Sequence, residues 1–120
     1  LIQKRAKQKK LEPNVWAMTG GSVIVGESSI DTIAREAKEE LDIDINTGDL
    51  KLITKFKTGN VWIDTYILNC NYDISKMKLQ ENEVSDVKWA TWTEIDELVN
   101  NGYFIKYRWE FVKEFLKKEI

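Results

Sequence analysis

The stretch GESSIDTIAREAKEELDI, from Gly26 to Ile43, carries the chain's clearest helix pattern together with four glutamates. Placing successive residues about 100° apart around a helix axis gathers its apolar side chains on one continuous arc. The members of that arc are Ile30, Ile33, Ala34, Ala37 and Leu41. The pattern predicts a helix from Ser29 to Leu41 that packs this arc on the core. Three charged side chains fall on the opposite side and are expected to face solvent: Asp31, Arg35 and Lys38.

Three of the glutamates, Glu36, Glu39 and Glu40, share a further arc that borders the apolar one. Like charges three or four residues apart on a helix repel one another, so this cluster costs free energy unless something screens it. A hard divalent cation such as Mg²⁺ or Mn²⁺ binds carboxylate oxygens and would remove the repulsion. The helix alone leaves two interpretations open, a solvated charged face and a metal site.

The composition restricts the chemistry. A chain of 120 residues suits a single domain, residues 1–120, with one core. It contains no histidine, which excludes a Ser–His or Cys–His nucleophile and the usual Cys/His zinc site within this sequence. A net charge of −2 gives no expectation of a nucleic-acid or membrane partner. The single cysteine, Cys70, is expected to be a small buried side chain and suggests a reducing, cytoplasmic location.

Strand and helix patterns alternate along the rest of the chain. Residues 1–5 resemble the end of a strand, and because the sequence starts inside this pattern we expect an N-terminal strand to be missing from it. The other expected elements are a glycine-interrupted strand at 16–27, a hairpin at 50–72 turning at 58–60, a polar loop at 75–86, a strand at 87–92, a helix from Thr93 to near Gly102 and a helix at 106–118. This order predicts an α/β fold with helices on both sides of a sheet.

The residues in and before the first helix resemble the signature of the Nudix hydrolases. Eight of its nine positions agree: Gly21, Glu27, Arg35, Glu36, Ala37, Glu39, Glu40 and Ile43. The departure is Asp42, where the family has a glycine that ends the helix in the left-handed conformation. Aspartate adopts that conformation less easily than glycine, so we expect a modest stability cost there. The flanking residues 3–5 and 13–16 resemble Nudix proteins related to isopentenyl-diphosphate isomerase.

The resemblance implies a Nudix-type α/β/α sandwich with a mixed sheet. It also implies Mg²⁺- or Mn²⁺-dependent cleavage of the pyrophosphate linkage of a small-molecule nucleoside diphosphate derivative. Carried over position by position, the metal ligands would be Glu36, Glu39 and Glu40. Arg35 would pair with Glu27 and orient the ligand helix, and Gly21 would let the backbone approach the metal and the substrate. The general base would be one of three carboxylates: Glu39, Glu40 or Glu83.

Other residues remain candidates for substrate contact. Lys4 and Arg5 are expected at a strand end, where they would meet phosphates. Trp16 and Trp62 would stack on a base or a sugar, unless they pack in the core.

Two further functions stay open: a catalytically silent Nudix-fold module that binds nucleotides or regulates, and an isopentenyl-diphosphate isomerase. The isomerase is disfavoured because Cys70 follows the signature instead of preceding it. The resemblance also permits a homodimer.

Overall fold

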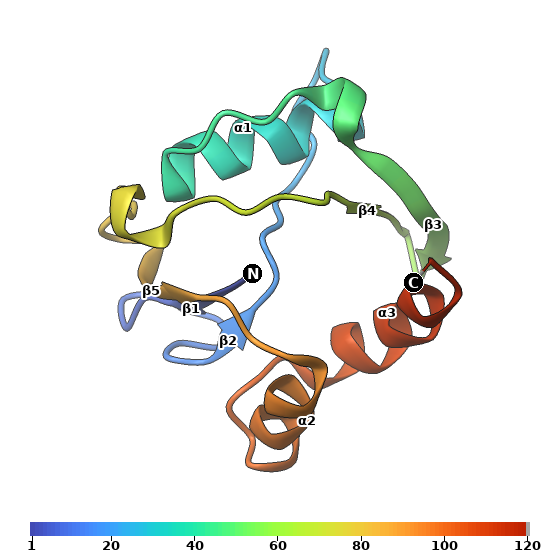
Figure 1. The fold of residues 1–120 in the computed structure, drawn as a ribbon. Helices are drawn as coiled ribbons and strands as arrows, with labels where there is room; N and C mark the ends of the chain where they lie inside the picture. Colours follow the sequence, from blue (N-terminus) through green and yellow to red (C-terminus); the bar gives the residue numbers. More distant parts are fainter. Residues whose placement is uncertain (120) are drawn as a thin grey trace.

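The strands and helices form three layers, with α1 on one side of the strands and α2 and α3 on the other (Figure 1). The computed structural model describes residues 1–119, apart from the side chains of Lys106 and Tyr107. The elements are β1 (Ile2–Arg5), β2 (Trp16–Ala17), α1 (Ser29–Leu41), β3 (Lys51–Thr58), β4 (Val61–Ile67), β5 (Val84–Lys88), α2 (Trp92–Asn100) and α3 (Lys106–Glu119), with short 3₁₀ turns at Thr47–Asp49 and Ile74–Lys76. The predicted α/β fold class is confirmed. Within residues 1–119 no helix has the length and hydropathy that crossing a membrane requires.

Two groups of strands make up the middle layer. The first has the order β2-β1-β5, and its central strand pairs antiparallel with both neighbours, so that Gln3 lies opposite Ala17 on one side and Val87 on the other. The second is the β3–β4 hairpin, which confirms the predicted turn. Gly59 has a φ of +59° there, a value that a two-residue hairpin loop needs and glycine adopts without strain.

Helix α1 has the bounds predicted from its pattern. Ser28 caps its start by accepting a hydrogen bond from the backbone N–H of Asp31. Its first turn contacts the hairpin, since the Ser29 hydroxyl donates to Asp64 over 2.6 Å and lies 2.7 Å from the Tyr66 hydroxyl. The other face of the hairpin meets α3, where the Phe56 and Phe111 ring centroids are 4.1 Å apart. The hairpin is therefore held between α1 and α3.

Helix α1 ends at Asp42, whose φ of 56° and ψ of 43° are left-handed, as the sequence predicted. Its backbone N–H donates to the Lys38 carbonyl. Asp42→Ala should lower the free energy of unfolding by about 1 kcal/mol, because alanine is strained in this conformation. Asp42→Gly should match or exceed the wild type. Urea unfolding of both variants measures this, and equal destabilisation by Ala and Gly would instead assign the effect to the lost ion pair with Lys38.

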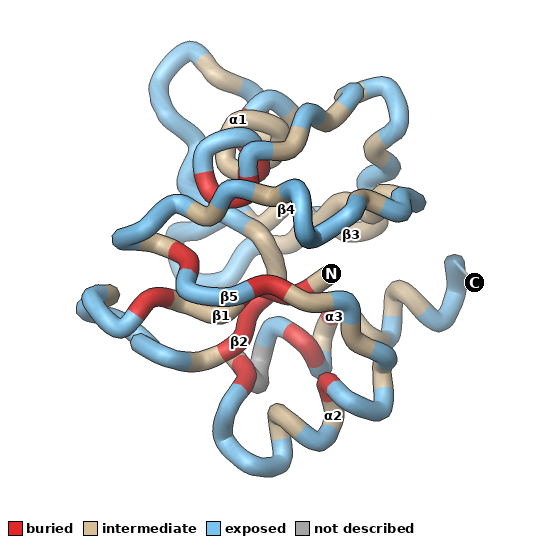
Figure 2. The backbone as a smooth tube through the Cα atoms, turned by 60° about the vertical axis from the view of Figure 1, so that its left-hand side comes forward, coloured by how far each residue is buried: buried red, intermediate tan, exposed pale blue. Residues whose placement is uncertain are grey.

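The core has two parts, one on each side of β1. Figure 2 shows buried residues where β1, β2 and β5 meet the helices. The part beneath α2 and α3 contains Ile2, Trp16, Ile95, Phe104 and Trp109. The part beneath α1 contains Leu41, Val84 and Val87. Since successive side chains of a strand point to opposite faces, β1 sends Ile2 into the first part and Gln3 towards α1.

Three element predictions need correction. The strand expected over 16–27 stops at Ala17, and the following loop exposes Val23, Ile24 and Val25. The strand expected at 87–92 is β5, Val84–Lys88, which begins inside the predicted polar loop because this segment pairs with β1, and which ends four residues early. Helix α2 begins at Trp92, because Thr91 and Glu94 form a capping box two residues before the expected start.

Candidate active site

Glu27, in the loop before α1, and Arg35, at the middle of the helix, form a two-point ion pair. The Arg35 Nε and Nη2 atoms donate to the two carboxylate oxygens of Glu27 over 2.8 and 3.1 Å, and the Thr32 hydroxyl donates to the same carboxylate over 2.6 Å. The Arg35 guanidinium, assisted by Thr32, lowers the pKa of Glu27 to about 2. The contact that the resemblance implied is therefore present, and it ties the loop before the helix to the helix itself.

Arg35 also reaches the signature glutamates. Its Nη1 atom lies 3.0 Å from Glu36 and 3.2 Å from Glu39, and Nη2 donates to the Ser22 carbonyl over 3.3 Å. The helix projection placed Arg35 on the solvent side, which is wrong for its side chain: only 27 % of it is exposed. The surrounding carboxylates explain the difference. Each accepts a charge-assisted hydrogen bond from the guanidinium and so takes the place of water beside it.

Glu40 is buried, with 7 % of its surface exposed. It accepts a hydrogen bond from the Gln3 side-chain amide, whose carbonyl oxygen accepts in turn from the Thr19 hydroxyl over 2.7 Å. Burial raises the pKa of Glu40 to about 7; the Gln3 contact opposes this shift, and nearby Glu36 adds to it. The Glu40 carboxylate is thus surrounded by like charges, and the neutral Gln3 amide donates its hydrogen bond to it.

The three signature glutamates occupy different environments. Glu40 is buried, the Glu36 side chain is 16 % exposed and that of Glu39 is 48 % exposed. Of the arc predicted to face the core, Ile30, Ile33 and Ala34 are only partly buried, while Thr32 and Glu40 are buried instead. In the described part of the chain, no group of three Asp, Glu, Cys or His side chains is arranged so that it could hold a metal ion. Arg35, between Glu36 and Glu39, supplies the positive charge at this place.

Gly21 lies against the Glu36 side chain. A Cβ atom at Gly21 would come within 2.2 Å of the Glu36 carboxyl carbon, closer than real Cβ contacts, whereas one at Gly20 would meet nothing within 4 Å. A side chain at position 21 would therefore displace the Glu36 carboxylate.

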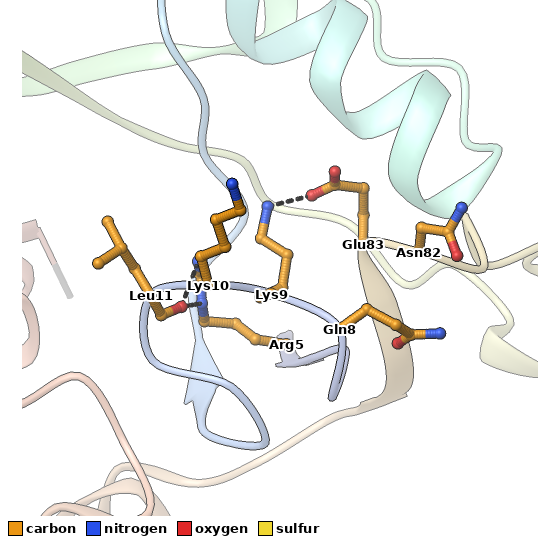
Figure 3. A pocket seen from close by; sticks show the side chains of 7 residues that line it. All are labelled: Arg5, Gln8, Lys9, Lys10, Leu11, Asn82 and Glu83. Atoms are coloured by element: carbon orange, nitrogen blue, oxygen red, sulfur yellow. Dashed lines mark hydrogen bonds and ion pairs between the residues drawn. The ribbon is translucent and has the colours of Figure 1, made fainter.

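Glu83 and Arg5 come from the other side of the site, where β1 ends and β5 begins. Glu83 forms an ion pair with Lys9, and its negative charge contributes to the raised pKa of Glu40. Arg5 donates from Nε and Nη2 to the Leu11 carbonyl over 3.2 and 2.9 Å, and Nε also donates to that of Glu12 over 3.1 Å. Both residues line one cavity (Figure 3).

Two predicted substrate contacts lie elsewhere. Trp16 is buried in the core beneath α2 and α3, with 8 % of its surface exposed, so a stacking role for it is wrong. Lys4 lies directly opposite Trp16 in the sheet and therefore on the same face, away from α1. Trp62 in β4 is 63 % exposed and remains a candidate for stacking. Cys70, expected to be buried, is exposed.

Sequence reasoning missed two supporting residues, Gln3 and Thr32. Both are buried polar side chains, and each binds a signature glutamate. Period-two alternation in β1 would have placed Gln3 on the face opposite Ile2. Thr32 precedes Glu36 by one helical turn, which would have placed it on the same side of α1.

The contacts of the signature residues described above involve α1 and the loop before it. A family model described as NUDIX domain matches residues 1–115 of the chain. The chain belongs to the Nudix family. It is 36 % identical over 110 residues to an uncharacterized Nudix hydrolase of Listeria innocua and 33 % identical over 108 residues to one of Listeria monocytogenes. Each alignment covers 89 % of this chain and 64 % of the relative, so the chain spans less than two thirds of the length of these Nudix relatives.

Solved structures agree with the fold. The protein DR0079 of Deinococcus radiodurans has a TM-score of 0.69 and 25 % identity, over 85 % of this chain and 64 % of that one. A MutT protein of Methanosarcina mazei has the same TM-score with 20 % identity, over 98 % and 83 % of the two chains. Together with the family match, these likenesses confirm the predicted Nudix fold.

Arg35→Lys tests the ion pair of this Nudix helix. Lysine keeps the positive charge but cannot offer the planar fork that binds both oxygens of Glu27. For the metal-dependent hydrolysis proposed below, in which Glu36 and Glu39 would be ligands, we expect kcat/KM to fall by about 10-fold. Lys38→Ala, on the same helix but paired with Asp42 and Asp44, should keep wild-type kinetics. Equal kinetics for Arg35→Lys and wild type would contradict the orienting role.

Proposed function

We propose that this Nudix chain hydrolyses the pyrophosphate linkage of a nucleoside diphosphate derivative, with Mg²⁺ or Mn²⁺ as cofactor. In this reaction water adds to one phosphorus, and the bond from that phosphorus to the bridging oxygen breaks. The observation that carries the proposal is the placement of Glu36, Glu39 and Glu40 on one helix, whose middle is tied by Arg35 to Glu27 in the preceding loop.

The three carboxylates of this helix are of the chemical type that a hard divalent cation binds, although in the described structure they are not gathered into a metal site. Carboxylate oxygens are the ligands that Mg²⁺ and Mn²⁺ prefer. Burial is the main cause of the raised pKa of Glu40, and the like charges of Glu36 and Glu83 add to it. A cation held by Glu36, Glu39 and Glu40 would relieve the repulsion. When bound, it would polarise a phosphoryl oxygen and acidify a coordinated water.

The chain's own residues would perform the remaining tasks. Arg35 would orient Glu36 and Glu39, since its Nη1 atom contacts both carboxylates. Gln3 would fix the direction of the Glu40 carboxyl through its amide. The proton of the attacking water would pass to a carboxylate, because the chain contains no histidine; Glu39, Glu40 and Glu83 all stay candidates for this base.

A substrate panel tests the proposal. The panel contains nucleotide sugars, ADP-ribose, dinucleoside polyphosphates and nucleoside triphosphates, each assayed by ³¹P NMR with Mg²⁺, with Mn²⁺ and with a chelator. We expect turnover of at least one class with metal, none with chelator, and reduced turnover by Glu39→Gln. Glu97→Gln, an exposed glutamate of α2, is the matched control and should behave as wild type. Absence of turnover together with absence of any metal-dependent rise in Tm would refute the proposal.

A binding module without catalysis is the second candidate. The position of Arg35 between Glu36 and Glu39 favours it, because a guanidinium there already balances part of the negative charge. Under this alternative, a nucleotide sugar would raise Tm in the presence of chelator, and no panel member would be turned over.

A further inference from the structure

A chain of hydrogen bonds runs from the segment after β2, through β1, to α1. It starts at the Thr19 hydroxyl, which donates to the Gln3 side-chain oxygen Oε1 over 2.7 Å. The nitrogen Nε2 of the same amide donates to Oε2 of Glu40. Both Gln3 and Glu40 are buried. A threonine outside the signature is therefore connected to a signature glutamate through one buried amide.

The Thr19 hydroxyl holds the far end of the Gln3 amide. A glutamine side chain can rotate about its bonds, and its amide ends in an acceptor oxygen and a donor nitrogen of nearly equal size. A buried acceptor that has no donor is costly, so without the hydroxyl the Gln3 amide would turn towards another partner. Such a turn would take Nε2 away from Glu40 or bring Oε1 against its carboxylate.

The Glu40 carboxylate depends on this donor for its position. Its neighbour Glu36 is a like charge, which repels the carboxylate and does not hold it. The Gln3 amide supplies the attractive contact. Two residues after Thr19, Gly21 leaves the space that the Glu36 side chain occupies. One short segment after β2 therefore acts on both glutamates, on one by a hydrogen-bond chain and on the other by leaving room.

We propose that Thr19 is a positioning residue for Glu40 and acts through Gln3, because its hydroxyl keeps the amide turned towards the carboxylate. Its value for catalysis rests on the proposed function, in which Glu40 is one of the residues that hold a divalent cation. The hydrogen-bond chain itself is present without a cation, so the contact and its consequence can be measured separately.

Binding of Mn²⁺ by the chelator-treated protein, followed by EPR, is the first test. Thr19→Val removes the hydroxyl and keeps the shape, and its Kd for Mn²⁺ should rise about 10-fold, as when a partner of a metal ligand is lost. Thr19→Ser restores the hydroxyl and should bind as wild type. Thr65→Val, the same change at a half-buried threonine of β4, is the matched control and should also bind as wild type. Equal weakening by Thr19→Val and Thr19→Ser would overturn the proposal, because it would assign the effect to packing.

A double-mutant cycle tests whether Thr19 acts through Gln3. Gln3→Met removes the amide and keeps the length of the side chain. In that background Thr19→Val should weaken Mn²⁺ binding no further, because the hydroxyl has lost its partner. Additive losses would overturn the route through Gln3.

The Gln3 side-chain amide, observed by ¹⁵N NMR without metal, separates this proposal from the proposed function. In the wild type we expect two well-separated proton signals that exchange slowly with water. Thr19→Val should shift them and speed their exchange, and Thr19→Ser should not. Unchanged signals in Thr19→Val would overturn the positioning role. If the wild type binds no Mn²⁺, the cation proposal fails, and these signals alone decide the role of Thr19.

Discussion

Glu40→Gln is expected to lose most of the catalytic activity, with kcat/KM falling by roughly 100- to 1,000-fold, as when one preorganised electrostatic contact to a reacting centre is removed. The side chains are nearly equal in size, and the glutamine carbonyl can still accept from Gln3. The fold should therefore persist. Activity is measured with Mg²⁺ on the panel substrate that gives the highest wild-type rate.

The same variant should be more stable than the wild type in the presence of chelator. Folding raises the pKa of Glu40 from 4.5 to about 7, so the folded protein holds this proton more tightly and the wild type loses stability as pH rises through that interval. Glutamine does not titrate. The gain should be nearly absent at pH 4.5 and below, and reach about 3 kcal/mol above pH 7.

Denaturant unfolding at pH 5 and pH 8 measures that difference, with Glu97→Gln as control. A Glu40→Gln protein that is less stable than wild type at pH 8 would mean that the carboxylate is a structural group. Unchanged kcat/KM would remove Glu40 from the catalytic set.

Gly21→Ala is expected to lower kcat/KM by about 100-fold, the loss that a misplacement of about 1 Å near the chemistry can produce. The added Cβ would lie 2.2 Å from the Glu36 carboxyl carbon, so Glu36 must move. Moving the end of a flexible side chain costs little free energy, and Tm should change by only a degree or two for a surface change of a few tenths of a kcal/mol. The concentration of Mg²⁺ giving half-maximal activity should rise.

Gly20→Ala is the matched control, because its Cβ would meet nothing within 4 Å. It should retain wild-type kinetics and metal dependence. Equal losses in the two variants would point to backbone stiffening of the loop in place of displacement of Glu36.

Local sequence information was sufficient for α1 and the hairpin. The helix has an apolar period, a serine cap and an end at Asp42, all within one stretch, and Gly59 marks the hairpin turn. The start of α2 was missed because Thr91 and Thr93 each precede an acidic residue by three positions, and only the structure selects Thr91. The start of β5 was missed because its pairing with Arg5 joins residues far apart in the chain.

The site was predictable where the signature specifies it. The Glu27–Arg35 contact followed from the resemblance, since both partners belong to the signature. The burial of Glu40 did not, because it depends on how α1 lies over β1 and on Gln3 beneath it. The cavity lined by Lys10 and Asn82 joins two loops distant in sequence, and no local pattern marks it.

Helix α1 contacts both sheets. Its first residue, Ser29, bonds to β4 of the hairpin, and Glu40 near its end bonds to β1 of the three-stranded sheet. The hairpin closes through a two-residue loop, whereas β1 and β5 lie far apart in the chain. Partial opening of the hairpin would release the first turn of the helix and leave its last turn docked on Gln3. Amide hydrogen exchange would then have two rates within the helix. The amides near Ser29 would exchange at the rate of the hairpin, and the amide of Glu40 would exchange at the rate of the three-stranded sheet.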